Sequence, residues 1–152
     1  MHFEDFATGQ TFRTASRTLD EAAIVGFAET YDWQPFHVDA AAAAVSPFGG
    51  IIASGFQTLL VAFGLTLDLK LWDGAGMGSP GMDSVRWLVP VRPGDTLTVE
   101  VEIVGLRPSR SKPDRGVVTF GHTVKRADGE AVMTYDTMVM IARRSVGAPM
   151  AP

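Results

Sequence analysis

The feature that most constrains the fold is a long apolar segment that runs from Ala53 to about Leu71. Its few polar residues are scattered along it rather than gathered on one face: Ser54, Gln57, Thr58, Thr66, Asp68 and Lys70. A helix that is apolar on almost all sides is typical of a buried helix. The sequence therefore predicts one long helix that the rest of the chain must cover.

The segments after Asp83 have the alternation of strands. Leu97, Val99, Val101 and Ile103 alternate with polar residues, which is the pattern of a half-buried strand. Turn sequences separate the strand candidates, at Pro93-Gly94-Asp95 and at Ala127-Asp128-Gly129-Glu130. Helices followed by a run of strands predict an α+β fold, in which an antiparallel sheet of about five strands covers the long helix.

The rest of the chain fits one domain. Its 152 residues are enough for a single core, and no linker or repeat divides them. Shorter helices are expected at 22–30, capped from Thr18, and at 40–44, capped by Asp39. We expect one domain over 1–152 with a core at about 5–143, and a frayed tail from Ser145 to Pro152.

Composition narrows the classes of partner. The net charge of −4 argues against a surface that binds nucleic acid, and the absence of cysteine excludes disulfides and thiolate chemistry. The acidic N-terminus lacks the pattern of a signal peptide, and no uninterrupted apolar run is long enough to cross a membrane. The expectation is a cytoplasmic protein without nucleic-acid or membrane partners.

A carboxylate and an imidazole flank a proline in the run Asp32-Trp33-Gln34-Pro35-Phe36-His37. On a continuous helix, residues five apart do not share a face, so Asp32 and His37 would not meet. Pro35 prevents that helix and turns the chain. Histidine exchanges protons near neutral pH, and a neighbouring carboxylate orients it or carries a second proton. The pair is therefore a candidate acid/base site.

A glycine-flanked helix start follows at Gly49-Gly50-Ile51-Ile52-Ala53-Ser54-Gly55. In this order and spacing, the two motifs resemble those of the MaoC-like hydratase family, which run approximately Asp-x-Asn-Pro-x-His-x-Asp and then a Gly-rich segment ending Ala-His-Gly. The turn Pro90-Val91-Arg92-Pro93-Gly94-Asp95 is similar to a third family motif. The resemblance covers about residues 5–143. Two positions depart from it, since Gln34 replaces the usual Asn and Ser54 the usual His.

The resemblance implies a hot-dog fold, an antiparallel sheet wrapped around a central helix, and a hydro-lyase. The family adds water to a trans-2-enoyl thioester to give a (3R)-hydroxyacyl thioester, or runs the reverse. Asp32 and His37 would hold the water, and the N–H of Gly55 would stabilise the thioester oxygen. The resemblance implies neither metal nor redox cofactor, and a coenzyme A or acyl-carrier thioester as the substrate.

Other residues are candidates for holding that substrate. Gln34 and Ser54, where the chain leaves the family pattern, are expected to affect substrate choice. Large side chains are expected to line the acyl pocket: Phe36, Phe48, Phe56, Leu60 and Trp87. The segment 107–115 has four basic residues and one acidic residue, so Arg110 and Lys112, with Arg86 and Arg92, are candidate phosphate ligands. The alternative, which the composition favours slightly, is that this segment is a solvated loop between strands.

Alternative functions remain open from the sequence. His37, Asp39 and His122 have the composition of a two-histidine, one-carboxylate iron site. Ser54, His37 and Asp32 have that of a hydrolase triad, although the Gly-x-Ser-x-Gly elbow is missing. A thioesterase or a non-catalytic thioester-binding subunit is compatible with the same fold. The edges of a five-stranded sheet also favour a homodimer formed by edge-to-edge pairing.

Overall fold

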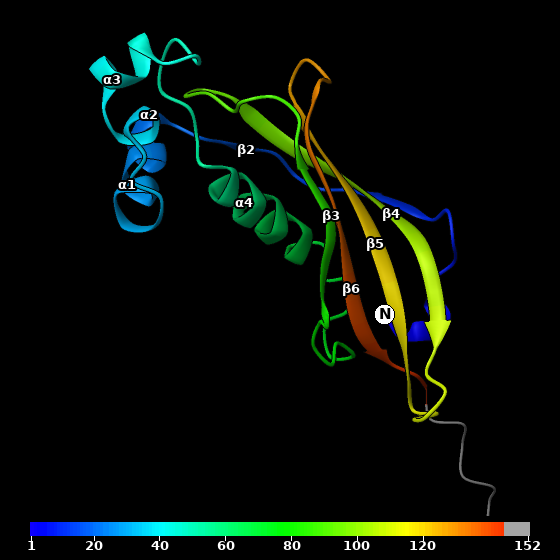
Figure 1. Cartoon of the computed structure of the whole chain (residues 1–152). Coiled ribbons are helices and arrows are strands. Elements are labelled where there is room, and N and C mark those ends of the chain that lie inside the picture. Colours follow the sequence, from blue (N-terminus) through cyan, green and yellow to red (C-terminus); the bar gives the residue numbers. More distant parts are fainter. Residues whose placement is uncertain (145–152) are drawn as a thin grey trace, which may run out of the picture.

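The computed structural model describes residues 1–144, and it shows one antiparallel sheet lying along one long helix (Figure 1). The expected tail from Ser145 lies outside the described residues. After a short 3-10 helix, η1 (Phe3–Asp5), the helices are α1 (Glu21–Tyr31), α2 (Pro35–Val38), α3 (Ala40–Val45) and α4 (Gly55–Leu67). The strands are β1 (Thr11–Arg13), β2 (Arg17–Thr18), β3 (Gly81–Trp87), β4 (Thr96–Pro108), β5 (Arg115–Arg126) and β6 (Ala131–Ala142).

The sheet has the order β1-β4-β5-β6-β3, and the two-residue β2 also pairs with β4. It is therefore six-stranded, against about five expected. The three longest strands form its centre through two hairpins, and the turn between β5 and β6 has Gly129 at φ 90° as expected for the hairpin sequence. Among residues 1–144, β3 pairs with β6 only, so its other side is a free edge of the sheet.

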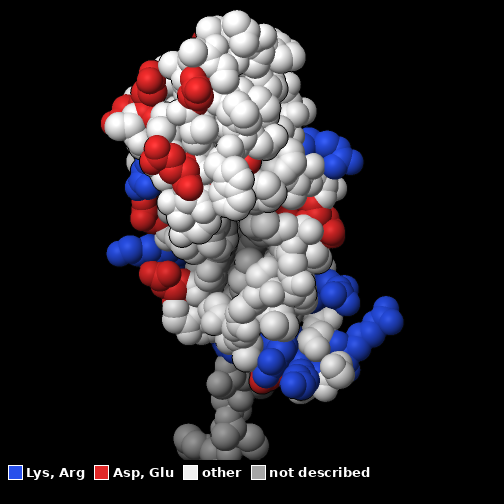
Figure 2. All heavy atoms as spheres, turned by 60° about the vertical axis from the view of Figure 1, so that its left-hand side comes forward, with Lys and Arg blue, Asp and Glu red and all other residues white. Residues whose placement is uncertain are grey.

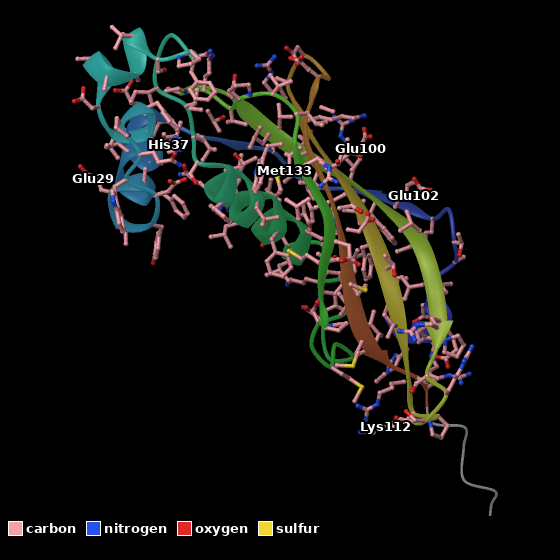
Figure 3. The ribbon with its side chains drawn as sticks, in the orientation of Figure 1. Glu29, His37, Glu100, Glu102, Lys112 and Met133 are labelled. Atoms are coloured by element: carbon pink, nitrogen blue, oxygen red, sulfur yellow. The ribbon has the colours of Figure 1, made fainter. Side chains whose placement is uncertain are left out.

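The core lies between α4 and the face of the sheet that is turned towards it. Strand residues of β4, β5 and β6 alternate between this inner face and the outer face, as period-two patterns require. The largest fully buried side chains of the inner face include Tyr135, Phe120, Leu97, Ile103 and Met133. Figure 3 shows Met133 between the helix and the sheet. The predicted α+β architecture is confirmed.

The helix α4 is shorter than the apolar segment and is buried on one side only. It buries Gln57, Thr58, Ala62, Leu65 and Thr66, whereas Phe56, Leu60 and Leu67 are 59%, 57% and 43% exposed. The expectation that the chain itself covers the helix all round is therefore wrong. The exposed residues form an apolar stripe, because positions 56, 60 and 67 lie on one face of a helix.

Two local details also differ from expectation. Asp20, not Thr18, caps α1, since its carboxylate accepts from the N–H of Ala23 at 2.7 Å, while the Thr18 hydroxyl bonds that of Thr96. Asp39 caps α3 as expected, through the N–H groups of Ala41 and Ala42. None of the helices within residues 1–144 has the length and apolar character needed to span a membrane.

Candidate active site

The turn around Pro35 brings the end of α1 close to α2. Asp32 follows the last residue of α1 and leaves the helical conformation, with φ −155°. Gln34 is extended, as the residue before a proline must be, and Pro35 begins α2. His37 therefore projects from a new short helix rather than from a continuation of α1. The chain turns where the sequence predicts a turn.

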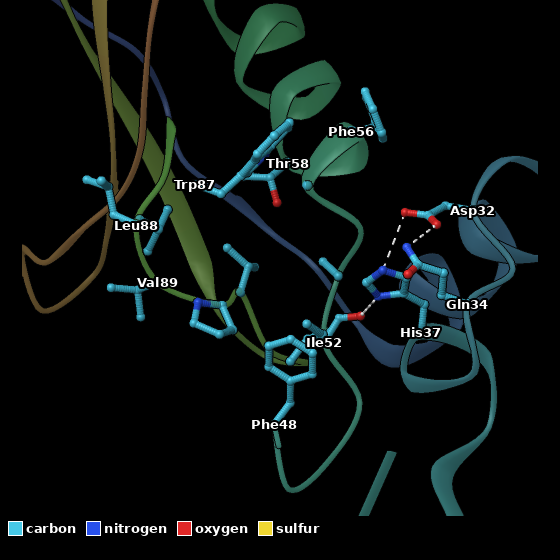
Figure 4. A pocket seen from close by; sticks show the side chains of 15 residues that line it. Asp32, Gln34, His37, Phe48, Ile52, Phe56, Thr58, Trp87, Leu88 and Val89 are labelled. Carbon is cyan, nitrogen blue, oxygen red and sulfur yellow. Dashed lines mark hydrogen bonds and ion pairs between the residues drawn. The ribbon is translucent and has the colours of Figure 1, made fainter. Parts of the chain in front are cut away.

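Asp32 and His37 meet across this turn. The Asp32 Oδ2 atom lies 3.4 Å from His37 Nε2, and the two side chains are 15% and 5% exposed (Figure 4). A carboxylate and an imidazole at this separation are close enough to share one proton or one water molecule. The geometry that the motif requires is therefore present within a single chain.

A backbone carbonyl sets the tautomer of His37. Its Nδ1 lies 2.7 Å from the carbonyl oxygen of Ile52. Since a carbonyl oxygen only accepts hydrogen bonds, Nδ1 must carry the hydrogen in the neutral ring. The lone pair is then on Nε2, which faces Asp32. The Ile52 segment is itself held by Ala53, whose N–H donates to Val91 at 2.8 Å.

Two side chains hold Asp32 in its ionised form. Ser54 donates its hydroxyl to Oδ2 at 2.6 Å, and the Gln34 amide donates to Oδ1 at 2.8 Å. Burial by itself raises the pKa of Asp32, but these two hydrogen bonds and the nearby His37 outweigh it and lower that pKa below its usual value. The two positions that depart from the family motif thus contact the carboxylate directly.

The start of α4 supplies a free backbone donor. Ser54 caps the helix by accepting from the N–H of Phe56 at 3.2 Å. Within residues 1–144, no hydrogen bond from the N–H of Gly55 is found. This donor lies at the positive end of the helix and faces the same cavity as the acid/base pair.

Trp87 lies directly against Gly55. A Cβ atom built on this glycine would overlap the indole ring, so the position has room for glycine only while the ring stays in place. Trp87 also contacts Phe56 edge-on, with ring centroids 5.7 Å apart, and is half exposed at the end of β3. The end of the edge strand therefore forms one wall of the site.

A cavity of about 440 Å³ joins these groups. Its lining is mostly apolar (Figure 4), and its polar side chains are those of Asp32, Gln34, His37 and Thr58. The other lining residues are Phe48, Ile52, Ala53, Gly55, Phe56, Trp87, Leu88, Val89, Pro90, Val91 and Val132. Three of the expected acyl-pocket residues line it, Phe48, Phe56 and Trp87. Phe36 does not line it but contacts the His37 ring edge-on, with ring centroids 4.6 Å apart. Leu60 lies on the exposed stripe of α4.

The basic candidates are not brought to this cavity. Figure 3 shows Lys112 at the opposite end of the molecule from His37, on the same β4–β5 hairpin as Arg110, and Figure 2 shows Lys and Arg gathered towards that end. Arg86 is absent from the lining and donates to the carbonyl of Val85. Arg92 bonds the carbonyl of Phe48 at 2.6 Å, beside the cavity. Within one chain, the lining of this cavity does not include Arg86, Arg110 or Lys112.

Sequence reasoning missed several residues of the site. The Ile52 carbonyl, Thr58 and the run Leu88-Val89 lie far from the acid/base motif in the chain. No pattern pointed to Ile52, because a carbonyl oxygen belongs to every residue. Trp87 was expected in the acyl pocket, but its contact with Gly55 was not.

His37, Asp39 and His122 are not arranged as the iron site that the sequence left open. Asp39 is used as a helix cap, and His122 is buried on the inner face of β5, where it stacks on Tyr135 with centroids 4.2 Å apart. Among residues 1–144 no group of three His, Cys, Asp or Glu side chains is placed to hold a metal ion. His122 is 2% exposed, and neither of its ring nitrogens has a hydrogen-bond partner within residues 1–144.

Comparisons with known proteins agree with this fold. The family model described as "MaoC like domain" matches residues 4–126, and the chain belongs to this family. The structure of a MaoC-like dehydratase from Rhodospirillum rubrum is similar with a TM-score of 0.88 at 38% identity, covering 95% of this chain and 98% of that one. The predicted hot-dog fold is confirmed.

Two curated relatives have names that state an activity. A 3-hydroxybutyryl-CoA dehydratase from Methylorubrum extorquens is 30% identical, covering 99% of this chain and 90% of the relative. An (R)-specific enoyl-CoA hydratase from Rhodospirillum rubrum is 32% identical, covering 94% and 93%. Other relatives are longer, and the chain spans 43% of a mesaconyl-CoA hydratase from Cereibacter sphaeroides.

Proposed function

We propose that the protein is a hydro-lyase that adds water to the double bond of a 2-enoyl thioester, forming a (3R)-3-hydroxyacyl thioester, or catalyses the reverse dehydration. The observation that carries the proposal is the Asp32–His37 pair, 3.4 Å apart, facing an apolar cavity that also receives the free N–H of Gly55. The names of the relatives support a hydratase or dehydratase acting on coenzyme A thioesters.

Asp32 and His37 together are suited to hold one water molecule. With the His37 ring neutral, both facing atoms are acceptors, the ionised Oδ2 of Asp32 and Nε2 of His37. A water molecule to one side of the pair donates one hydrogen to each, which leaves its oxygen lone pairs directed into the cavity. Asp32 is a weak base because the hydrogen bonds from Ser54 and Gln34 already stabilise its charge. We therefore assign the removal of the water proton to His37 Nε2 and the orientation of the water to Asp32.

The Asp32–His37 pair can supply and take up every proton that the addition of water requires. The water oxygen forms a bond to C3 of the enoyl group, while His37 takes one of the water protons. Electrons of the double bond move onto the thioester oxygen, and the resulting enolate collapses when the pair returns a proton to C2. The reaction needs no oxidant or reductant. Both proton transfers occur on the same face of the substrate.

The free N–H of Gly55 is suited to the thioester oxygen. Negative charge develops on that oxygen in the transition state, and a helix N-terminus stabilises such charge. Removal of one donor of this kind costs about 2.7–4 kcal/mol in other enzymes. The Trp87 ring beside Gly55 limits the path of the thioester, and the apolar lining favours an uncharged, short or branched acyl group.

A direct assay tests the proposal. The full-length protein is mixed with crotonyl-CoA, and loss of the ultraviolet absorbance of the enoyl thioester is followed. We expect turnover, and we expect Asp32→Asn or His37→Ala to lower kcat/KM by about 10²- to 10⁴-fold. The matched control is Asp39→Asn, which alters a nearby carboxylate that caps α3 and lies outside the cavity lining.

The assay also separates the remaining alternatives. A thioesterase releases free coenzyme A thiol from saturated acyl-CoA and leaves the enoyl bond intact. A binding subunit retains the thioester without either reaction. Either result, obtained across several acyl chain lengths, would overturn the proposal. A coenzyme A or acyl-carrier thioester as substrate, a cytoplasmic location and a homodimer stay predictions of this proposed function.

A further inference from the structure

The backbone N–H of Gly55 satisfies only part of the thioester oxygen in the proposed reaction. An oxygen that gains negative charge has more than one lone pair, and this N–H fills one of them. The cavity around it is mostly apolar. Because an acceptor left unpaired away from water costs free energy, the transition state gains from a second donor close to Gly55.

Most polar side chains of the lining are already engaged in hydrogen bonds. The Gln34 amide donates to Asp32, and Nδ1 of His37 donates to a backbone carbonyl. The Thr58 hydroxyl donates at 3.3 Å to the carbonyl of the residue four positions before it. The indole N–H of Trp87 differs, because it has no hydrogen-bond partner within residues 1–144. Trp87 therefore brings an unused donor to the cavity, and an indole nitrogen acts as a donor only.

The indole nitrogen lies close to Gly55. Its Nε1 atom is less than 3 Å from the position that a Cβ atom of Gly55 would take. The backbone nitrogen of a residue lies about 2.5 Å from its own Cβ, so the two donor nitrogens are at most about 5.5 Å apart. Two N–H donors that are each about 2.9 Å from one oxygen are separated by up to about 5.8 Å. The distance therefore permits one oxygen atom to accept from both donors.

The neighbours of Trp87 hold its ring at this place. Trp87 ends β3, where it pairs with Met133 of β6, and its ring contacts Phe56 edge-on with centroids 5.7 Å apart. Donors that are fixed before the substrate arrives stabilise developing charge without a cost of reorganisation. Figure 4 shows Trp87 across the cavity from His37. A substrate between them presents its thioester oxygen to the start of α4 and its double bond to the acid/base pair.

We propose that the indole N–H of Trp87 is a second donor to the thioester oxygen, which it binds together with the N–H of Gly55. This assignment rests on the proposed function and adds a residue to it. The indole donates a hydrogen bond and keeps its proton, so the proton that reaches C2 still comes from the Asp32–His37 pair. Trp87 is then a catalytic residue as well as a wall of the cavity.

The opposing explanation is that the Trp87 ring only fills space. In that case the ring packs on Gly55, its N–H is hydrated at the half-exposed side of the ring, and the substrate meets the backbone donor alone. Both explanations predict that Trp87→Ala damages the cavity, so this variant does not separate them. A variant that keeps a flat ring and removes the N–H separates them.

Trp87→Phe is that variant, made in the full-length protein. We expect it to lower kcat for crotonyl-CoA by about ten- to hundredfold, the usual effect of losing a hydrogen bond to a charged group. The KM should change by about threefold or less, because the donor acts mainly in the transition state. The control is Trp33→Phe, at a tryptophan that is 73% exposed and outside the cavity lining, and it should retain the kcat of the wild type.

Infrared difference spectroscopy separates the hydrogen bond from the packing. Butyryl-CoA labelled with ¹³C at the thioester carbonyl has no double bond to hydrate, and it is bound to the wild type and to both variants. Hydrogen bonds to a carbonyl oxygen lower its stretching frequency, so the downward shift should be smaller in Trp87→Phe than in the wild type or Trp33→Phe. An equal shift in all three would overturn the role of Trp87. Absence of crotonyl-CoA turnover in the wild type would instead count against the proposed function.

Discussion

The carboxylate of Asp32 accepts two hydrogen bonds that favour its charged form, from Ser54 and Gln34. A carboxylate held in this way remains an acceptor at any pH near neutrality, and it orients water instead of exchanging its own proton. The division of labour between Asp32 and His37 follows from these neighbours. At the residue scale, the two departures from the family motif are therefore the residues that set the charge of the pair.

Removal of the Ser54 hydroxyl should make the ionised form of Asp32 less stable. Ser54→Ala deletes the 2.6 Å hydrogen bond to Asp32, so the pKa of Asp32 rises and the acid limb of the kcat/KM profile moves to higher pH. The activity should fall about ten- to hundredfold, the usual effect of losing a hydrogen bond to a charged group. Ser54→Thr keeps the hydroxyl and should restore most of it. An unshifted acid limb in Ser54→Ala would contradict this role.

Helices, strands and turns with a clear local sequence pattern could be predicted. Contacts between elements that lie far apart in the chain could not. The half-buried strand that contains Leu97 to Ile103 and the turn at Pro35 follow from local patterns. The end of α4 was placed too late, because apolar residues continue into the segment after Leu67. The burial of His122 and the contact of Trp87 with Gly55 depend on how β5, β6 and β3 lie against α4, which no local pattern encodes.

The β5–β6 pair contains a pH-sensitive group in its buried face. Burial lowers the pKa of His122 from 6.5 to about 4. Between these values the unfolded chain binds a proton that the folded chain does not, so stability falls as pH decreases from about 6.5 to about 4. His122→Phe removes this dependence. Urea unfolding at pH 7 and pH 4.5 should show wild type losing about 2–3 kcal/mol more than the variant. Equal losses would contradict the assignment.

The junction of β3 with the start of α4 should control activity more than stability. Gly55→Ala adds a methyl group that overlaps the Trp87 indole, and this half-exposed ring must move. We expect kcat/KM to fall by on the order of tenfold to a hundredfold through displaced substrate. Chemical unfolding should show a change below about 1 kcal/mol. In a Trp87→Ala background the same substitution should have little effect, and an undiminished effect there would contradict this explanation.

Within a single chain, residues 1–144 leave one side of the central helix and the β3 edge of the sheet uncovered. In the homodimer expected from the sequence, pairing at a sheet edge would couple folding to association. The melting temperature should then rise over an about hundredfold increase in protein concentration. Differential scanning calorimetry at several concentrations measures this. A melting temperature independent of concentration would show that association does not contribute to stability.

The central claim is that one acid/base pair on one face of the substrate performs both proton transfers. Hydration of crotonyl-CoA in D₂O, followed by NMR of the 3-hydroxybutyryl product, tests it most directly. We predict that the hydroxyl at C3 and a single deuterium at C2 are added to the same face, with (R) configuration at C3. Addition to opposite faces would require a second proton donor across the cavity and would contradict the account.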